Sequence, residues 1–302
     1  MILTDDKITE IFCIIDDFCK IFDKIIERHA VKTPGKRGYH RDGRMSKAEI
    51  MVIVIMFHCS GYRCLKHFYL EYICGRRRDM FPETVSYNRF VELEKTVGLP
   101  LAVFIKKFLL GRCTGISFVD STTLKACRSQ RILTHRTFRG LAQRGRSSMG
   151  WFYGFKLHLI CNEKGEILNF MLTPGNVDDR APLDSKSFVE AVYGSLVGDK
   201  GYISRDLFQR LFVNGIQLIT KVKNNMKNSL MSVADKILLR KRAIIESVND
   251  ELKNIAQVEH SRHRSFDNFF INTLGAVAAY CYFPKKPCVS VCRVFDNQLT
   301  LF

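Results

Sequence analysis

The chain has 302 residues, of which 46% are apolar and 25% are charged, a composition that fits a soluble protein with one large domain or two smaller ones. An excess of 47 Lys and Arg over 30 Asp and Glu gives a net charge of +17, which favours nucleic acid over a membrane surface as partner. The eleven cysteines form no Cys-x-x-Cys pair, no signal peptide is evident, and no apolar stretch reaches the roughly 20 residues that span a bilayer. We therefore expect a cytoplasmic protein with reduced thiols and no membrane segment.

The first part of the chain, residues 1–108, is predicted to be helical. Apolar residues recur every three or four positions over residues 8–26, which is typical of a helix that buries one face. Ser46 and Glu49 then form a capping-box pattern ahead of an apolar helix, which we expect Gly61 to end.

Two further helical segments are expected in this region, at residues 65–72 and 86–90, with a run of three arginines between them. They leave two interpretations open. The segments form either a helix-turn-helix unit that binds DNA or a small helical bundle with incidental charge.

From residue 109 the pattern changes to strands separated by helices, and a second domain is expected over residues 109–283, followed by a tail at 284–302. Strands are predicted at residues 116–122, 151–161, 166–173, 196–198 and 216–220. A hairpin followed by helical crossovers predicts an α/β fold, with a mixed five-stranded sheet flanked by helices and its first and fourth strands side by side. The apolar helix at residues 266–283 is expected to cover this sheet.

Three acidic residues suggest a metal site. Asp120 and Asp199 each follow an apolar strand, and adjacent strands would bring them together. Glu246 lies on a predicted helix, nearly in line with Arg242 and Lys253 at 3.6 residues per turn. Carboxylates that lie so close together repel one another unless a cation neutralises their charge, and oxygen ligands suit Mg²⁺ or Mn²⁺. For Glu246 taken alone, a solvent-exposed helix with ordinary ion pairs is the alternative.

Basic side chains supply candidate contacts to DNA phosphates. No acidic residue occurs between Ser121 and Asn162, and so basic a stretch should repel itself without an anion. The candidate DNA-binding residues are Lys125, Arg139, Arg144, Arg146, Lys156, His158, Lys200, Tyr202, Lys221 and Lys223.

Several of these positions have plainer interpretations. Lys221 and Lys223 fit a solvated loop equally well, and His158 fits a hydrogen-bonded histidine inside the protein. Trp151, the single tryptophan, could stack on a base, but we expect it in the core at the start of a strand. Asp179 could act as a rival acid, but its place before a helix favours N-capping.

The motifs together resemble the DDE transposases of bacterial insertion sequences, most closely insertion-sequence family 982. The matching segments, spread over roughly residues 45–283, are Phe118–Thr122, Tyr153–His158, Thr173–Asn176, Gly198–Tyr202 and Arg242–Lys253. One departure is Leu239, where the family has a tyrosine. The resemblance implies an RNase H-like catalytic domain in which Asp120, Asp199 and Glu246 form the catalytic triad and bind two Mg²⁺ or Mn²⁺ ions. It also implies that Arg242 and Lys253 contact DNA near the scissile phosphate.

The function implied is Mg²⁺-dependent cleavage at the ends of an insertion sequence, followed by attack of the new 3′-hydroxyl on target DNA. The partners would be double-stranded DNA, both inverted repeats and target, and further copies of the chain assembled on DNA at the bacterial nucleoid. Two alternatives remain open. One is a DNA-binding regulator or a decayed transposase, neither of which would have catalytic activity. The other is a metal-dependent phosphohydrolase with Asp120 as nucleophile, in which Thr122 stands where a second aspartate is commonly found.

Overall fold

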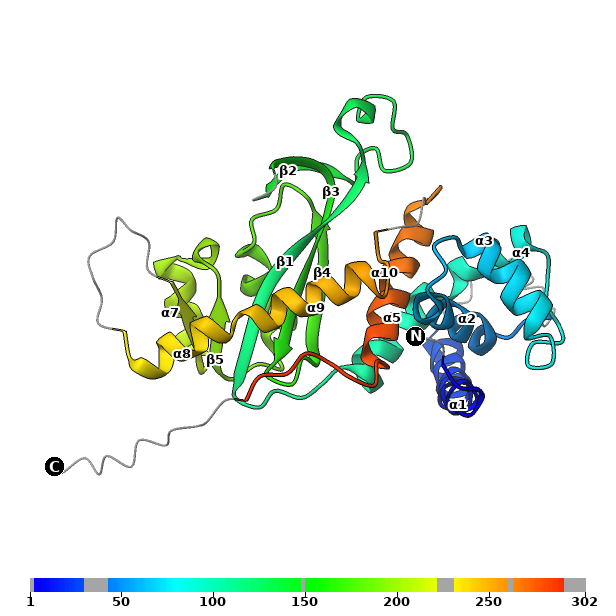
Figure 1. Ribbon diagram of the computed structural model, residues 1–302, viewed down its shortest axis with the longest axis horizontal. Helices are drawn as coiled ribbons and strands as arrows, with labels where there is room; N and C mark the ends of the chain where they lie inside the picture. Colours follow the sequence, from blue (N-terminus) through cyan, green and yellow to red (C-terminus); the bar gives the residue numbers. More distant parts are fainter. Residues whose placement is uncertain (1–2, 30–42, 148–149, 222–230, 260–262, 291–302) are drawn as a thin grey trace. The chain divides into compact units, whose positions relative to one another are not determined.

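The computed structural model describes residues 3–29, 43–147, 150–221, 231–259 and 263–290, and the chain divides into two compact units (Figure 1). The helical unit comprises Met1–Leu109, His135–Arg139 and Asp250–Phe283. The sheet unit comprises Leu110–Thr134, Gly140–Asn249 and Pro284–Phe302. This division differs from the predicted one, because the segment from Asp250 to Phe283 groups with the N-terminal helices.

The N-terminal region is helical, as predicted. Its elements are α1 (Asp5–His29), α2 (Lys47–Ser60), α3 (Leu65–His67), the π-helix η1 (Phe68–Arg76), α4 (Tyr87–Glu94), η2 (Lys95–Val97), α5 (Gly98–Phe104) and η3 (Ile105–Leu109). The predicted capping box is present at the start of α2, where Ser46 Oγ accepts from the Glu49 amide, and Gly61 ends the helix with φ 78°.

The apolar stripe of α1 is buried only in part. Ile8, Ile11, Ile15 and Phe18 are buried, whereas Ile25 and Ile26 are 48% and 45% exposed. The prediction of one continuous core face therefore fails at the C-terminal end of the helix. Among the described residues, no single helix is long and apolar enough to cross a membrane, and only α2 taken with Leu65–Arg76, a pair bent by 116°, passes that test by length and composition.

The helix α10 (Phe266–Cys281) lies at the centre of the helical unit and packs against α2 and α5. The prediction that this segment covers the sheet is wrong. Apolar residues occur on every side of α10, and it is buried from Phe269 to Tyr280 with only Phe270 less enclosed, as suits a helix surrounded by other helices. The approach to α2 is close at Gly275, where an added Cβ would lie 2.5 Å from Val54 Cγ1.

The sheet unit holds a six-stranded mixed sheet. Its strands are β1 (Ile116–Cys127), β2 (Gln143–Ser147), β3 (Gly150–Asn162), β4 (Ile167–Pro174), β5 (Gly194–Gly198) and β6 (Ile216–Thr220). Their order is β2-β3-β1-β5-β6, with β4 also paired to β3, and β1 runs antiparallel to β3 but parallel to β5. The five predicted strands and the neighbouring first and fourth strands are confirmed. Strand β2 was not predicted, because Gln-Arg-Gly-Arg-Ser carries no apolar alternation.

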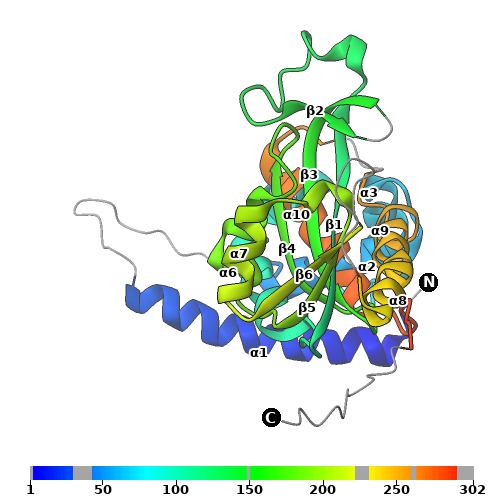
Figure 2. The same ribbon diagram turned by 90° about the vertical axis from the view of Figure 1, so that its left-hand side faces the viewer.

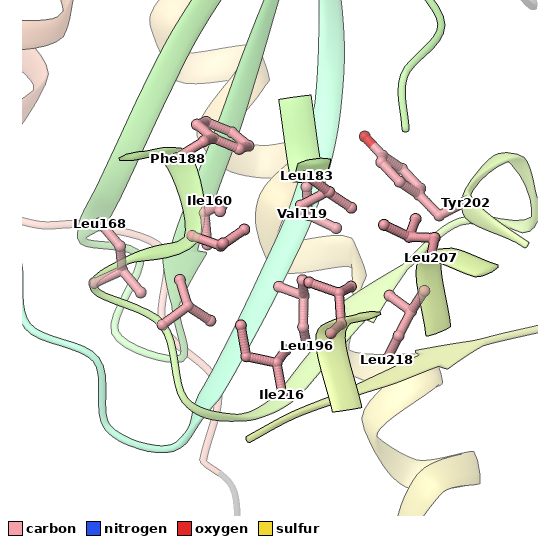
Figure 3. Close-up of a cluster of buried hydrophobic side chains, with 13 residues drawn as sticks. Val119, Ile160, Leu168, Leu183, Phe188, Leu196, Tyr202, Leu207, Ile216 and Leu218 are labelled. Carbon is pink, nitrogen blue, oxygen red and sulfur yellow. The ribbon is translucent and has the colours of Figure 1, made fainter. Parts of the chain in front are cut away.

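Helices cover both faces of this sheet. The helices α6 (Lys186–Val189) and α7 (Arg205–Val213) lie on one face, and α8 (Val233–Lys241) and α9 (Ala243–Asn254) on the other (Figure 2). The α6–α7 face holds a core that includes Val119, Ile160, Leu196 and Tyr202 (Figure 3). Side chains alternate along a strand, so Val119 in this core directs the next residue, Asp120, to the α9 face.

A substitution tests the close packing of α10 on α2. We expect Gly275→Ala to destabilise the protein by about 1–3 kcal/mol, because the added Cβ would also lie 2.9 Å from His58 Cδ2, and both His58 and Val54 are buried. Urea unfolding followed by circular dichroism measures the change. The control is Gly75→Ala, whose Cβ would meet only Leu70 O at 3.6 Å. Equal unfolding midpoints for the two variants would contradict this packing.

Candidate catalytic site

The site begins where the pairing between β1 and β5 ends. The parallel ladder joins Ile116–Phe118 to Ser195–Val197 and stops there. Continued by two residues, the same register places Asp120 level with Asp199, the residue directly after β5. The prediction that Asp120 ends its own strand is wrong, because β1 continues to Cys127. It is β5 that ends, which leaves the β1 edge beside Asp120 open to side chains.

Two side chains of α9 and its N-terminal boundary contact Asp120 directly. Asn249 Nδ2 donates to Asp120 Oδ2 at 3.2 Å, and Arg242 Nη1 lies 3.7 Å from Asp120 Oδ1. The second guanidinium nitrogen of Arg242 donates to Glu246 Oε1 in a short ion pair. Arg242 therefore stands between two of the three predicted metal-binding carboxylates and holds each by a different nitrogen.

Asp120 is the recessed member of the triad. Its side chain is 23% exposed, whereas that of Glu246 is 57% exposed. Burial raises the pKa of Asp120 to about 6; the Arg242 charge and a hydrogen bond from the Ser121 backbone oppose this shift, and the charges of Asp199 and Glu246 add to it. The single guanidinium thus does not fully offset the dehydration of Asp120 and the charges of its two acidic neighbours.

The structure brings the triad together in part. Among the described residues, no three Asp, Glu, His or Cys side chains are gathered closely enough to form a ready metal site. Asp199 acts on Asp120 through its charge, and Glu246 is tied to Arg242. That Asp120, Asp199 and Glu246 bind a shared metal ion therefore stays a prediction.

The surroundings nevertheless fit a divalent cation. All three acids offer hard oxygen ligands, and a cation would supply the positive charge that Asp120 lacks. Two nearby oxygens, Asn249 Oδ1 and Tyr202 Oη, are buried without a hydrogen-bond partner among the described residues. Buried polar atoms of this kind usually have partners, so the site has unused coordination and hydrogen-bonding capacity.

A second polar cluster lies on the other side of β1. Lys156 Nζ pairs with Asp179 Oδ1 at 2.9 Å, and the same oxygen accepts from Ser121 Oγ at 2.7 Å. The prediction that Asp179 caps a helix is therefore wrong. Asp179 instead binds the buried ammonium group of Lys156. His158 is 1% exposed and bonds Thr173 Oγ1 through Nε2 at 2.8 Å. The predicted DNA contacts of Lys156 and His158 do not agree with this burial.

The remaining DNA-binding candidates differ in exposure. Tyr202 is 2% exposed and packs in the core, so its predicted DNA contact does not agree with its position either. The side chains of Lys125, Arg139, Arg144, Arg146, Lys200 and Lys221 are exposed. Lys223 lies outside the described residues. Lys253 lies in the part of α9 assigned to the helical unit and pairs with Glu259 at 3.6 Å.

The antiparallel pair β2–β3 carries an aromatic residue that sequence reasoning misplaced. Trp151 faces Arg146 across the pair and is 71% exposed, so the prediction of a core position is wrong. The neighbouring pair is Arg144 and Tyr153. The many basic residues and the lack of acidic ones between Ser121 and Asn162 could have indicated that this pair of strands faces solvent.

A sequence model of the family described as "Transposase DDE domain" matches residues 110–266, more than half of the chain. No curated protein matches the chain in sequence. Among solved structures, the piggyBac transposase synaptic complex with hairpin DNA is 12% identical, with a TM-score of 0.47 over 92% of this chain and 72% of that one.

Two complexes of Mos1 are also similar. The Mos1 strand transfer complex is 11% identical, with a TM-score of 0.22 over 88% of this chain and 87% of that chain. The Mos1 paired-end complex with left transposon end is 13% identical, with a TM-score of 0.23 over 88% of each chain.

The role of Arg242 as counter-charge can be tested without any DNA. We expect Arg242→Gln to lower stability in EDTA by about 1–2 kcal/mol, because Asp120 loses a partly buried cation while the exposed Glu246 contributes little. Added Mn²⁺ should restore more stability to this variant than to the wild type. Thermal unfolding in EDTA and in Mn²⁺ measures both effects, with Arg240→Gln, an exposed cation on α8, as control. An unchanged melting temperature in EDTA would contradict this role.

Proposed function

The chain belongs to the family of transposase DDE domains, and on that premise we propose that it cuts DNA at the ends of a mobile element and joins the freed 3′-hydroxyl to target DNA. The observation that carries this proposal is the position of Asp120 and Asp199 at the end of the β1–β5 ladder, with Glu246 linked to Asp120 through Arg242. This arrangement suits phosphoryl transfer, in which the protein positions groups and stabilises charge rather than forming a covalent bond.

Asp120, Asp199 and Glu246 would hold Mg²⁺ or Mn²⁺, and we propose two ions. When bound, such ions lower the pKa of an attacking hydroxyl and stabilise the leaving oxygen. The same three acids serve both cleavage and joining, because the two reactions differ only in whether water or a DNA 3′-hydroxyl attacks.

The chain's own residues then have separate tasks. Asn249 fixes the orientation of Asp120 through its bond to Oδ2, so that Oδ1 faces Arg242. With the acids occupied by cations, the Arg242 guanidinium would be free to bind a DNA phosphate through two nitrogens. Lys253 would hold a phosphate further along α9. The bond from Lys156 to Asp179 supports the site by holding the β1–β3 backbone beside it.

The exposed basic residues supply the surface for DNA. We propose that Lys125, Arg144 and Arg146, with Lys200 and Lys221, contact the backbone of element and target DNA, and that Arg139 and Lys223 extend this surface. Joining two element ends requires at least two copies of the chain on DNA. A bacterial insertion sequence of family 982, acting at the nucleoid, is the source that the motifs favour.

The two other functions explain less of the chain. A DNA-binding regulator without catalysis has no use for an arginine placed between Asp120 at the sheet edge and Glu246 on α9. A phosphohydrolase that uses Asp120 as nucleophile would want a second acid at the position of Thr122, whose side chain is instead buried in the sheet.

Cleavage of the element's own terminal repeats tests the proposal. We expect the wild type to nick labelled repeat DNA only with Mg²⁺ or Mn²⁺. Asp120→Asn should lose at least about a thousandfold in rate, because a cation ligand is removed from the reacting centre. Its DNA affinity should stay within a few-fold of wild type, and Asp206→Asn, an exposed acid on α7, serves as the matched control. Equal cleavage by Asp120→Asn and wild type would refute the assigned triad.

A further inference from the structure

The helical unit contains a cavity that the proposed chemistry does not use. It has a volume of about 590 Å³, within the range of about 300–1,000 Å³ typical of small-molecule sites. Its walls come from α2, α3, α4 and the start of α10, all within the helical unit. The cavity is therefore a feature of one compact part of the chain.

The floor of the cavity carries unused hydrogen-bonding groups. His58 is 2% exposed and Glu94 is 3% exposed. His58 Nε2, Glu94 Oε2 and His263 Nε2 are all buried without a hydrogen-bond partner among the described residues. His58 Nδ1 is bonded to the Ala256 carbonyl at 2.6 Å and must donate there, so its Nε2 is an acceptor.

These floor groups are uncharged near neutral pH. Burial raises the pKa of Glu94 to about 8, and burial lowers the pKa values of His58 and His263 to about 4. A protonated carboxyl group can donate a hydrogen bond, and neutral imidazoles can accept one. The floor thus offers donors and acceptors without a net charge, which suits a polar, uncharged heterocycle. Among the described residues, these side chains are not gathered closely enough to hold a metal ion.

The rim has the opposite character. The cations that line it are Arg63, Lys66 and Arg264, all exposed, and Glu94 on the floor is the one acidic lining residue among those described. An anionic group is therefore expected at the mouth.

The cavity also has apolar and aromatic lining side chains. They include Val54, Phe57, Tyr87 and Val91. Flat aromatic rings bind well between such side chains. A ligand that matches all three zones has a planar base for the walls and floor and a phosphate for the rim.

We propose that this cavity binds a single nucleotide displaced from a DNA duplex, with its base inside and its flanking phosphates on Arg63, Lys66 and Arg264. The inference rests on the proposed action on DNA, and it assigns to the helical unit the recognition of an unpaired position. Taking a base out of the stack costs least where it is already unpaired. The cavity would therefore favour DNA with a bulged or distorted site over fully paired DNA.

The test compares two short labelled duplexes of the same sequence, one fully paired and one with a single unpaired adenine. Binding is measured by fluorescence anisotropy in EDTA at neutral pH, so that cleavage plays no part. We expect wild type to bind the bulged duplex about tenfold more tightly, since stacking contributes about 1–3 kcal/mol per base. Asp120→Asn should show the same ratio, which separates this result from that of the cleavage test.

Two variants locate the preference. Replacing Arg63, Lys66 and Arg264 together by alanine should reduce the ratio to near one, and so should Val91→Phe, which fills the cavity. The control replaces Lys95, Lys106 and Lys107 by alanine. These are exposed cations of the helical unit outside the cavity, so the net charge changes equally while the ratio stays near tenfold.

A ratio near one in wild type would overturn the proposal, and this is the result expected if the cavity takes a protein side chain instead. A tenfold ratio that persists in the alanine triple variant would also overturn it, because the preference would then lie elsewhere. If Val91→Phe fails to fold, the triple variant decides alone, since its changes are confined to exposed side chains.

Discussion

The early end of the β1–β5 ladder is the constraint on which the rest of the sheet unit depends. Three residue pairs join the two strands in parallel, and the register then sets Asp120 and Asp199 side by side where β5 has already ended. Strand alternation sends Val119 into the core and turns Asp120 toward α9. The missing strand neighbour leaves room for Arg242 and Asn249 to reach the carboxylate, so one backbone feature supplies both the acids and the access to them.

This position has an energetic consequence. Lost hydration is the main cause that raises the pKa of Asp120 to about 6; the neighbouring acids contribute to this rise, and the charge of Arg242 opposes it. The Arg242 guanidinium supplies positive charge between Asp120 and Glu246. We propose that the Arg242 guanidinium balances the charge of Asp120 and Glu246 while no metal ion is bound, and that metal ions would take over this role. This exchange would also free an arginine for DNA at the moment when the ions bind.

Much of the sheet and its acids could be predicted from sequence, because apolar strands and the Gly-Asp-Lys-Gly-Tyr motif give local signals. Features that depend on tertiary packing could not. The apolar α10 fits a sheet cover or a helical core equally well by pattern, and it belongs to the helices. Tryptophan is typical of a protein core, which is why a core position was predicted for Trp151. The strand β2 beside it is too polar to form a buried layer, and Trp151 is therefore 71% exposed. The cavity between α2, α4 and α10 joins residues as distant as His58 and His263, a pairing that no local spacing shows.

We propose that Asp120 and Asp199 share a cation although they come from different strands. Titration of the DNA-free chain with Mn²⁺, with free Mn²⁺ followed by electron paramagnetic resonance, tests it most directly. The account predicts that Asp120→Asn and Asp199→Asn each weaken the same tight binding step, and that the double variant binds no worse than the weaker single one. Mn²⁺ binding that is unchanged in Asp199→Asn, or losses that add independently, would contradict it.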